Sequence, residues 1–166
     1  MSANGCELDG GAHRDRPRRK RGTNVGFCIY YSSTRAVTAA EAEAINEATI
    51  PLCDDPDWVG CEPICFNECL DAYVDGHLTG SSKLSMKAHH EYEIDDGDRI
   101  ATIHDLMDAL CQLSRDHQIG WEIVHSYYDG PVGYIRSGLA DDKLVAEIDR
   151  LSAEIEAIRE GKEPPV

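Results

Sequence analysis

Four of the chain's seven cysteines fall within seventeen residues, at Cys53, Cys61, Cys65 and Cys69. Thiolates that converge from short hooks bind zinc or an iron–sulfur cluster, and the last three of these cysteines have such spacing. A regular strand or helix, however, would hold the first and last of those three too far apart for one metal ion. Two alternatives follow: a zinc site formed by these four cysteines, or small apolar side chains in the core.

A second candidate is the segment from His77 to Lys83. With its neighbouring glycines, Ser81, Ser82 and Lys83 could offer amides, hydroxyls and an ammonium group to a phosphate or a carboxylate. The spacing is not that of a Walker A motif. The segment is therefore either the binding loop of a small enzyme or the edge of a strand.

A third candidate surrounds the Gly130-Pro131 turn, where Tyr128 and Arg136 stand among further tyrosines. Aromatic side chains next to an arginine are typical of binding surfaces, although a hairpin also carries them for packing. With His77, Ser81, Ser82 and Lys83, these two residues complete the predicted ligand-binding set. No catalytic residue and no cofactor are predicted, with zinc at the four cysteines as the possible exception.

The elements that must position these residues can be predicted from local patterns. Residues 25–32 form a short apolar and aromatic run that predicts a buried strand. Thr38 and Glu41 predict a capping box that begins a helix ending near Ala48. Residues 50–60 contain two prolines and three aspartates, which predict a loop.

Residues 61–74 suit either a helix or a strand, and we favour strand, turn and strand because Asp75-Gly76 follows. Thr102 and Asp105 predict a second capping box and an amphipathic helix that ends at Gly120. A strand over 121–128 and a short strand after Pro131 follow. This order predicts an α+β fold, a ferredoxin-like βαββαβ sandwich with an antiparallel sheet and helices on one face, plus a C-terminal helix.

The C-terminal helix begins near Asp141 and carries apolar residues at heptad spacing. They are Leu144, Ile148, Leu151, Ile155 and Ile158. Two alternatives explain this seam: it packs on the sheet, or it joins two copies in a homodimer.

Charge divides the chain unevenly. Residues 1–24 carry six basic and three acidic side chains, a net charge of +3. Because the whole chain has a net charge of −15, residues 25–166 have a net charge of −18. We expect three regions: a disordered basic tail (1–24), an α+β core (25–138), and an amphipathic helix with a short tail (139–166). An acidic body repels membranes and nucleic acids and favours a partner with a basic surface, although the tail itself resembles a nucleic-acid-binding patch.

The odd number of cysteines and the polar N-terminus, which has no apolar segment of a secretory signal, favour the cytoplasm. No apolar run approaches the length of a membrane span. We therefore expect a small acidic cytoplasmic protein that acts as a non-catalytic binding or protein-interaction module. The alternatives are a metal-binding protein that uses Cys53–Cys69 and a small enzyme that uses His77–Lys83.

Overall fold

The computed structural model describes residues 26–54, 58–66, 73–74, 76–87 and 99–162 of the chain. The predicted 1–24 tail and the polar segment 89–98 lie outside these residues. The elements, in chain order, are β1 (Gly26–Ser33), α1 (Ala39–Cys53), β2 (Cys65–Phe66), β3 (Tyr73–Val74), β4 (His77–Ser85), α2 (Ile103–Asp116), β5 (Trp121–His125), β6 (Gly133–Arg136), β7 (Leu139–Ala140) and α3 (Asp142–Arg159).

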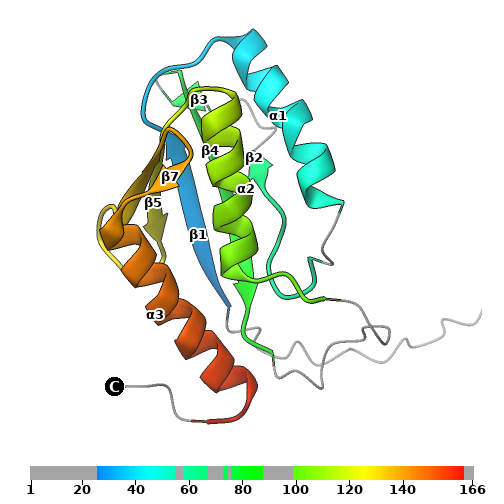
Figure 1. Ribbon diagram of the computed structural model, residues 1–166, viewed down its shortest axis with the longest axis vertical. Coiled ribbons are helices and arrows are strands. Elements are labelled where there is room, and N and C mark those ends of the chain that lie inside the picture. Colours follow the sequence, from blue (N-terminus) through cyan, green and yellow to red (C-terminus); the bar gives the residue numbers. More distant parts are fainter. Residues whose placement is uncertain (1–25, 55–57, 67–72, 75, 88–98, 163–166) are drawn as a thin grey trace, which may run out of the picture.

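The sheet has the order β2-β4-β1-β5-β6-β7, and β3 pairs with β4. Each described pairing is antiparallel, and β1 lies between β4 and β5. In Figure 1 the three helices lie in front of the strands. The predicted α+β class with an antiparallel sheet is confirmed. The predicted ferredoxin-like arrangement is not confirmed, because the strand order differs. The sheet continues past β5 into β6 and β7, and the chain forms two separate two-residue strands before β4.

Both predicted capping boxes are present. The Thr38 hydroxyl accepts from the Glu41 backbone N–H at the start of α1, and Thr102 and Asp105 make the same exchange at the start of α2. The end of α1 differs from the prediction, because the helix runs through Pro51 to Cys53. A proline in the last turn removes a single intrahelical hydrogen bond, so that the helix can continue past the position where a loop was expected.

Between α1 and β4, the described chain is extended. Cys61 forms an isolated bridge with Leu84, and the two-residue strands β2 and β3 each pair with β4. The strand interpretation therefore holds for the described part of 61–74, while Cys69 lies outside it. This segment depends on β4 for its position, because a two-residue strand has little stability of its own.

The seam of α3 faces inward. Leu144, Ile148, Leu151 and Ile155 are buried within the single chain and join the core made by the sheet and the other helices. Of the two alternatives for this seam, packing within the chain is the one the structure shows. A homodimer stays a prediction and would need another surface. None of the helices described here is long and apolar enough to span a bilayer.

Candidate binding face

Burial alternates residue by residue along the central strands. Phe27, Ile29 and Tyr31 of β1 are buried, whereas Cys28, Tyr30 and Ser32 are partly or fully exposed. Strands β4 and β5 alternate in the same way. Because successive side chains of a strand point to opposite faces, one face of the sheet packs on the helices. The side chains that alternate with the buried ones in β1, β4, β5 and β6 form the other side, which we call the open face.

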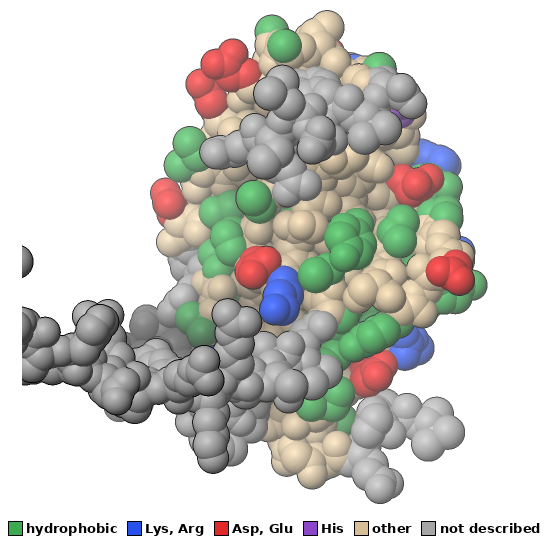
Figure 2. All heavy atoms as spheres, turned by 180° about the vertical axis from the view of Figure 1, so that it is seen from behind, with side chains coloured by type: hydrophobic (Ala, Val, Ile, Leu, Met, Phe, Trp, Pro, Cys, Tyr) green, Lys and Arg blue, Asp and Glu red, His purple; other side chains and the backbone are tan. Residues whose placement is uncertain are grey.

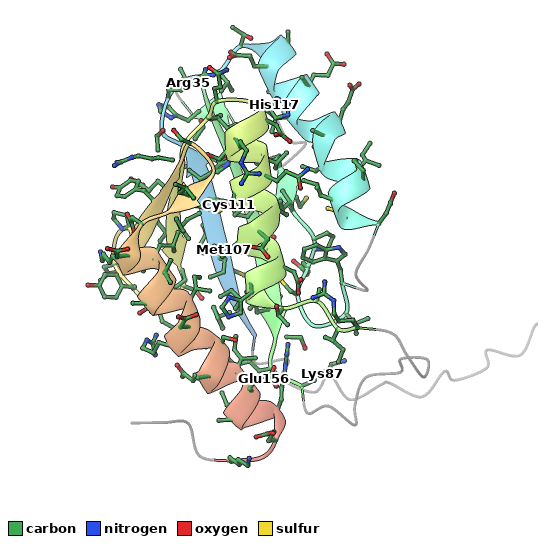
Figure 3. The ribbon with its side chains drawn as sticks, in the orientation of Figure 1. Arg35, Lys87, Met107, Cys111, His117 and Glu156 are labelled. Carbon is green, nitrogen blue, oxygen red and sulfur yellow. The ribbon has the colours of Figure 1, made fainter. Side chains whose placement is uncertain are left out.

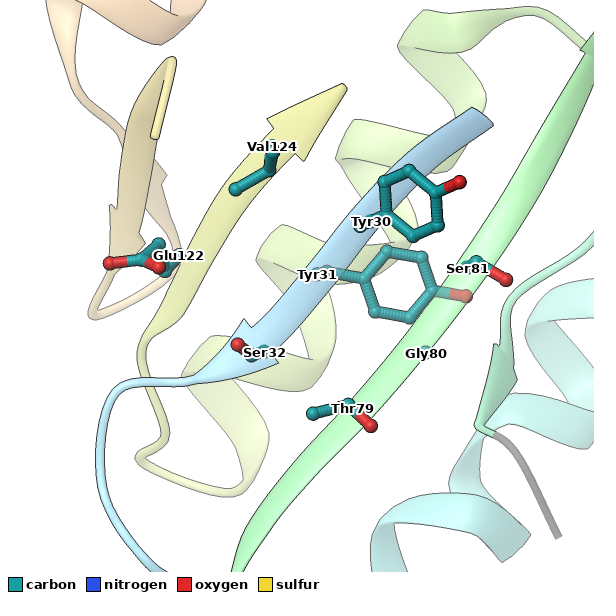
Figure 4. Close-up of a pocket in the computed structure, with 8 residues that line it drawn as sticks. All are labelled: Tyr30, Tyr31, Ser32, Thr79, Gly80, Ser81, Glu122 and Val124. Carbon is teal, nitrogen blue, oxygen red and sulfur yellow. The ribbon is translucent and has the colours of Figure 1, made fainter. Parts of the chain in front are cut away.

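Register aligns the open face in rows across the strands. Tyr30 pairs with Ser81 on one side and Val124 on the other, and Ser32 pairs with Thr79 and Glu122. A shallow hollow of about 190 Å³ covers these rows. Figure 4 shows how its residues lie on three neighbouring strands. They are Tyr30, Tyr31, Ser32, Thr79, Gly80, Ser81, Glu122 and Val124.

A second, broader hollow of about 550 Å³ adjoins the first and shares Ser32, Thr79 and Glu122 with it. His77, Tyr134 and Arg136 are among its other lining residues. Figure 2, which views the molecule from behind, shows hydrophobic side chains, a class that there includes tyrosine, on this side, with scattered charges between them. The open face is therefore broad and shallow rather than deeply hollowed.

Polar contacts fix part of this face. The Tyr134 hydroxyl donates to Glu122 Oε2 at 3.1 Å, and this hydrogen bond to a carboxylate raises the pKa of Tyr134. The guanidinium of Arg136 lies 4.7 Å from the centre of the Tyr134 ring, a cation–π distance. These contacts hold Glu122, Tyr134 and Arg136 as one ordered group.

Charge is distributed unequally between the two sides. The three helices contain eleven Asp and Glu against four Lys and Arg, a net charge of −7. The other described residues contain six of each sign, a net charge of zero. The acidity of the described part of the chain therefore belongs to the helices, and the open face has no excess of negative charge.

Four of the six predicted ligand-binding residues belong to the open face: His77, Ser81, Lys83 and Arg136. Three of them lie on β4 and not in the predicted loop, because residues 79–85 pair with β1 and residues 77–78 pair with β3. His77 Nδ1 lies 2.6 Å from the Ser33 carbonyl oxygen, which orients its ring. The backbone N–H of Lys83 donates to the Glu62 carboxylate.

Ser82 is different, because it faces the core. It is fully buried, donates to the Pro63 carbonyl at 3.0 Å, and lies 3.2 Å from the Tyr31 hydroxyl. That hydroxyl accepts from the Cys65 backbone N–H at 2.9 Å. Ser82 therefore helps to hold the 61–66 segment against β4, and its hydroxyl is not presented to a ligand on the surface.

Tyr128 lies beyond the end of β5 and does not line either hollow. Its ring is 6.2 Å from that of His125, and the Lys143 ammonium lies 5.9 Å from its centre. The buried His125 places Nε2 3.0 Å from the Glu147 carboxylate. Tyr128 therefore does not share a hollow with Arg136, and its part in ligand binding stays a prediction.

The cysteines take separate environments. Cys61 is buried, and this burial raises the pKa of its thiol to about 12, which disfavours the thiolate that a metal requires. Cys53 is half-buried at the end of α1, while Cys65 is exposed. Among the described residues, no group of three or more His, Cys, Asp or Glu is arranged to hold a metal ion. A site that includes Cys69 stays a prediction, because Cys69 lies outside the described chain.

Several residues of the open face were not singled out from the sequence. Tyr30, Ser32, Thr79 and Glu122 lie at its centre. The sequence signal that could have identified them is the strand period of two in residues 26–33 and 77–85, because alternate side chains of a strand lie on opposite faces. The expectation that 25–32 is simply a buried strand missed this separation. Comparison with protein-family models, curated proteins and solved structures finds no match to this chain.

Proposed function

We propose that this protein is a non-catalytic protein-binding module and that the open face of the sheet is its contact surface. The observation that carries the proposal is the composition of that face: tyrosine and small side chains on neighbouring strands, with few charges, in a chain whose helices are strongly acidic. Protein interfaces are depleted of charge at their centre and enriched in tyrosine and arginine.

The shape of the face supports the same proposal. Both hollows are shallow and open onto a sheet surface, whereas a small substrate is usually enclosed in a deep cleft. Tyr30, which is 44% exposed, stands at the centre of the face. An exposed tyrosine buries a large area on association while losing little conformational entropy, so Tyr30 is the expected hot spot.

Affinity capture from the native host tests this proposal. A partner recovered with the wild-type chain should be lost with Tyr30→Glu, which places a charge in the middle of the contact. A hot-spot residue typically contributes about 2 kcal/mol or more, so that binding should weaken by a factor of about 30. The matched control is Val145→Glu on α3, since Val145 is 46% exposed and its helix already carries acidic residues. Equal recovery with both variants would argue against the open face.

The charge of the helices favours a second candidate surface. An acidic inhibitor that covers a basic partner would use the helical side, where the net charge is −7. Such binding would be steered by electrostatics and would weaken as salt is raised. It would also be sensitive to acidic residues of α3 and insensitive to Tyr30→Glu, which distinguishes the two surfaces.

The other functional alternatives are supported less well by the described residues. The enzyme alternative relied on a loop over 77–83, and this segment is a strand with Ser82 buried. The metal-binding alternative needs Cys61 to leave the core as a thiolate. As a framework, we propose a ferredoxin-like unit built from β1, α1, β2, β4, α2 and β5, extended by β6 and β7; such a frame accommodates many functions.

A further inference from the structure

A hollow of about 440 Å³ lies where α2 ends and the β6–β7 turn passes beside it. Its lining includes Arg115, Gln118, Arg136 and Ser137, together with Thr34 after β1. We call it the arginine notch. Figure 3 labels His117, the C-cap residue that follows α2 and precedes Gln118 in the sequence. Among the described residues that line the notch, none is a carboxylate.

The arginines of the notch differ from the other described arginines. Each of the other four is paired with a carboxylate, and these are Arg35, Arg99, Arg150 and Arg159. Within the described residues, Arg115 and Arg136 have no such ion pair, although the chain has 31 acidic side chains against 16 basic ones. Two guanidinium groups without a carboxylate partner line one hollow, in a protein where carboxylates are abundant. An anion bound between them would supply the missing opposite charge.

The backbone shapes the notch closely. Gln118 (φ 49°) and Ser137 (φ 51°) are the two described residues other than glycine with a left-handed backbone, and both line the notch. Ser137 and Gly138 (φ 78°) make the tight turn between β6 and β7, as a type I′ turn requires. Gln118 takes the place after α2 where glycine is usual. The structure therefore has a less favourable residue than glycine at this position, and that residue lines the notch.

Close contacts determine where the Arg115 and Arg136 side chains lie. A Cβ atom on Gly138 would lie 2.9 Å from Arg115 Nε, so the Arg115 side chain crosses directly over this glycine. A Cβ on Gly120 would lie 2.5 Å from Thr34 Oγ1, which means that the floor of the notch has no room for a side chain. Arg136 rests against the Tyr134 ring. Both arginines are exposed at the surface, and these contacts orient their side chains beside the notch.

We infer that the arginine notch is a binding site for a small oxyanion, a phosphate or a carboxylate group, held by Arg115 and Arg136 with the Gln118 amide and the Thr34 and Ser137 hydroxyls as further donors. Guanidinium groups bind both kinds of oxyanion through paired charge-assisted hydrogen bonds. The inference requires no protein partner, although Arg136 also lines the broader hollow of the open face.

Two-dimensional NMR of the arginine side-chain N–H groups and of the Gln118 and Ser137 amides tests the inference. The full chain is titrated with sodium phosphate and, separately, with sodium malonate, while sodium chloride keeps the ionic strength constant. Saturable shifts of these signals are expected with at least one of the two anions. Saturation by phosphate alone identifies a tetrahedral ligand, and saturation by malonate alone identifies a carboxylate ligand.

Variants connect the response to the notch. Arg115→Gln and Arg136→Gln should each weaken binding at least about tenfold, which corresponds to the loss of one charge-assisted contact. Arg150→Gln is the matched control, since it removes the same charge from an exposed arginine paired within α3. Backbone spectra of the three variants establish that each is folded. The inference is overturned if neither anion gives saturable shifts, or if Arg150→Gln weakens binding as much as the notch variants do.

Discussion

The Tyr31 hydroxyl is the polar contact on which the position of the 61–66 segment most depends. Tyr31 is 1% exposed, and its hydroxyl accepts from the Cys65 backbone N–H and lies within hydrogen-bond distance of the Cys65 carbonyl and the Ser82 hydroxyl. Burial raises the pKa of this phenol, so it is neutral and can donate as well as accept. Tyr31→Phe removes this hydroxyl and leaves the ring in its edge-on contacts with Phe66 and Trp121.

The expected cost follows from the groups that lose a partner. A partly buried N–H that loses its acceptor costs about 1–3 kcal/mol, while Phe avoids the desolvation of the hydroxyl, so Tyr31→Phe should lower the free energy of unfolding by about 2 kcal/mol. For a chain of this size the midpoint of thermal unfolding should fall by about 4–8 °C. Urea unfolding gives the free energy, and hydrogen exchange at the Cys65 amide should become faster.

The neighbouring Tyr30→Phe is the matched control. It makes the same chemical change on the open face, where the Tyr30 hydroxyl interacts with the Cys28 side chain, and it should change stability by no more than about 0.5 kcal/mol. Combining Tyr31→Phe with Ser82→Ala should cost less than the sum of the single changes, because the two hydroxyls share one network. A Tyr31→Phe variant as stable as Tyr30→Phe, with unchanged exchange at Cys65, would refute this reasoning.

Leu151, the cysteines and Glu41 give three further predictions. Leu151→Ala should lower the free energy of unfolding by about 2–5 kcal/mol without changing the molecular mass in light scattering; conversion of a dimer to a monomer would instead place the α3 seam at an interface. Cys61→Ser should cost about 1–3 kcal/mol in urea unfolding and Cys65→Ser less than about 0.5 kcal/mol, whereas equal losses that accompany release of zinc would support the metal site. The Thr38 backbone N–H, with Arg35, lowers the pKa of Glu41 from 4.5 to about 2. The stabilising contribution of Glu41 is therefore present above pH 4.5 and is lost as the pH falls towards 2. Glu41→Gln should flatten the dependence of the free energy of unfolding on pH in that range, and an unchanged dependence would contradict this assignment.

Local signals predicted the helices well. The capping boxes at Thr38 and Thr102 involve residues three apart, so that they can be recognised without any knowledge of the rest of the fold. The inward-facing side of α3 also follows from its spacing, although spacing alone did not distinguish packing within the chain from a dimer. The predicted end of α1 was wrong because a proline in the final turn of a helix gives the same local sequence signal as a proline in a loop.

The candidate sites depended on longer-range information. Ser81 and Ser82 are adjacent in the sequence, but only the pairing of β4 with β1 decides that Ser82 faces the core. Arg115 and Arg136 lie 21 positions apart in the sequence and line the same hollow because β5 and β6 fold back beside the end of α2. The composition of the chain as a whole suggested an acidic surface, and only the fold shows that the acidity of its described part lies on the helices.

Photo-crosslinking in the native host tests the central proposal most directly. A photoreactive phenylalanine replaces Tyr30 on the open face in one variant and Val145 on α3 in another, since the two positions are similarly exposed. The proposal predicts a discrete adduct with another protein from position 30 and none from position 145. An adduct from position 145 alone would move the contact to the acidic helices, and the absence of any adduct from position 30 would contradict the open face as a binding surface.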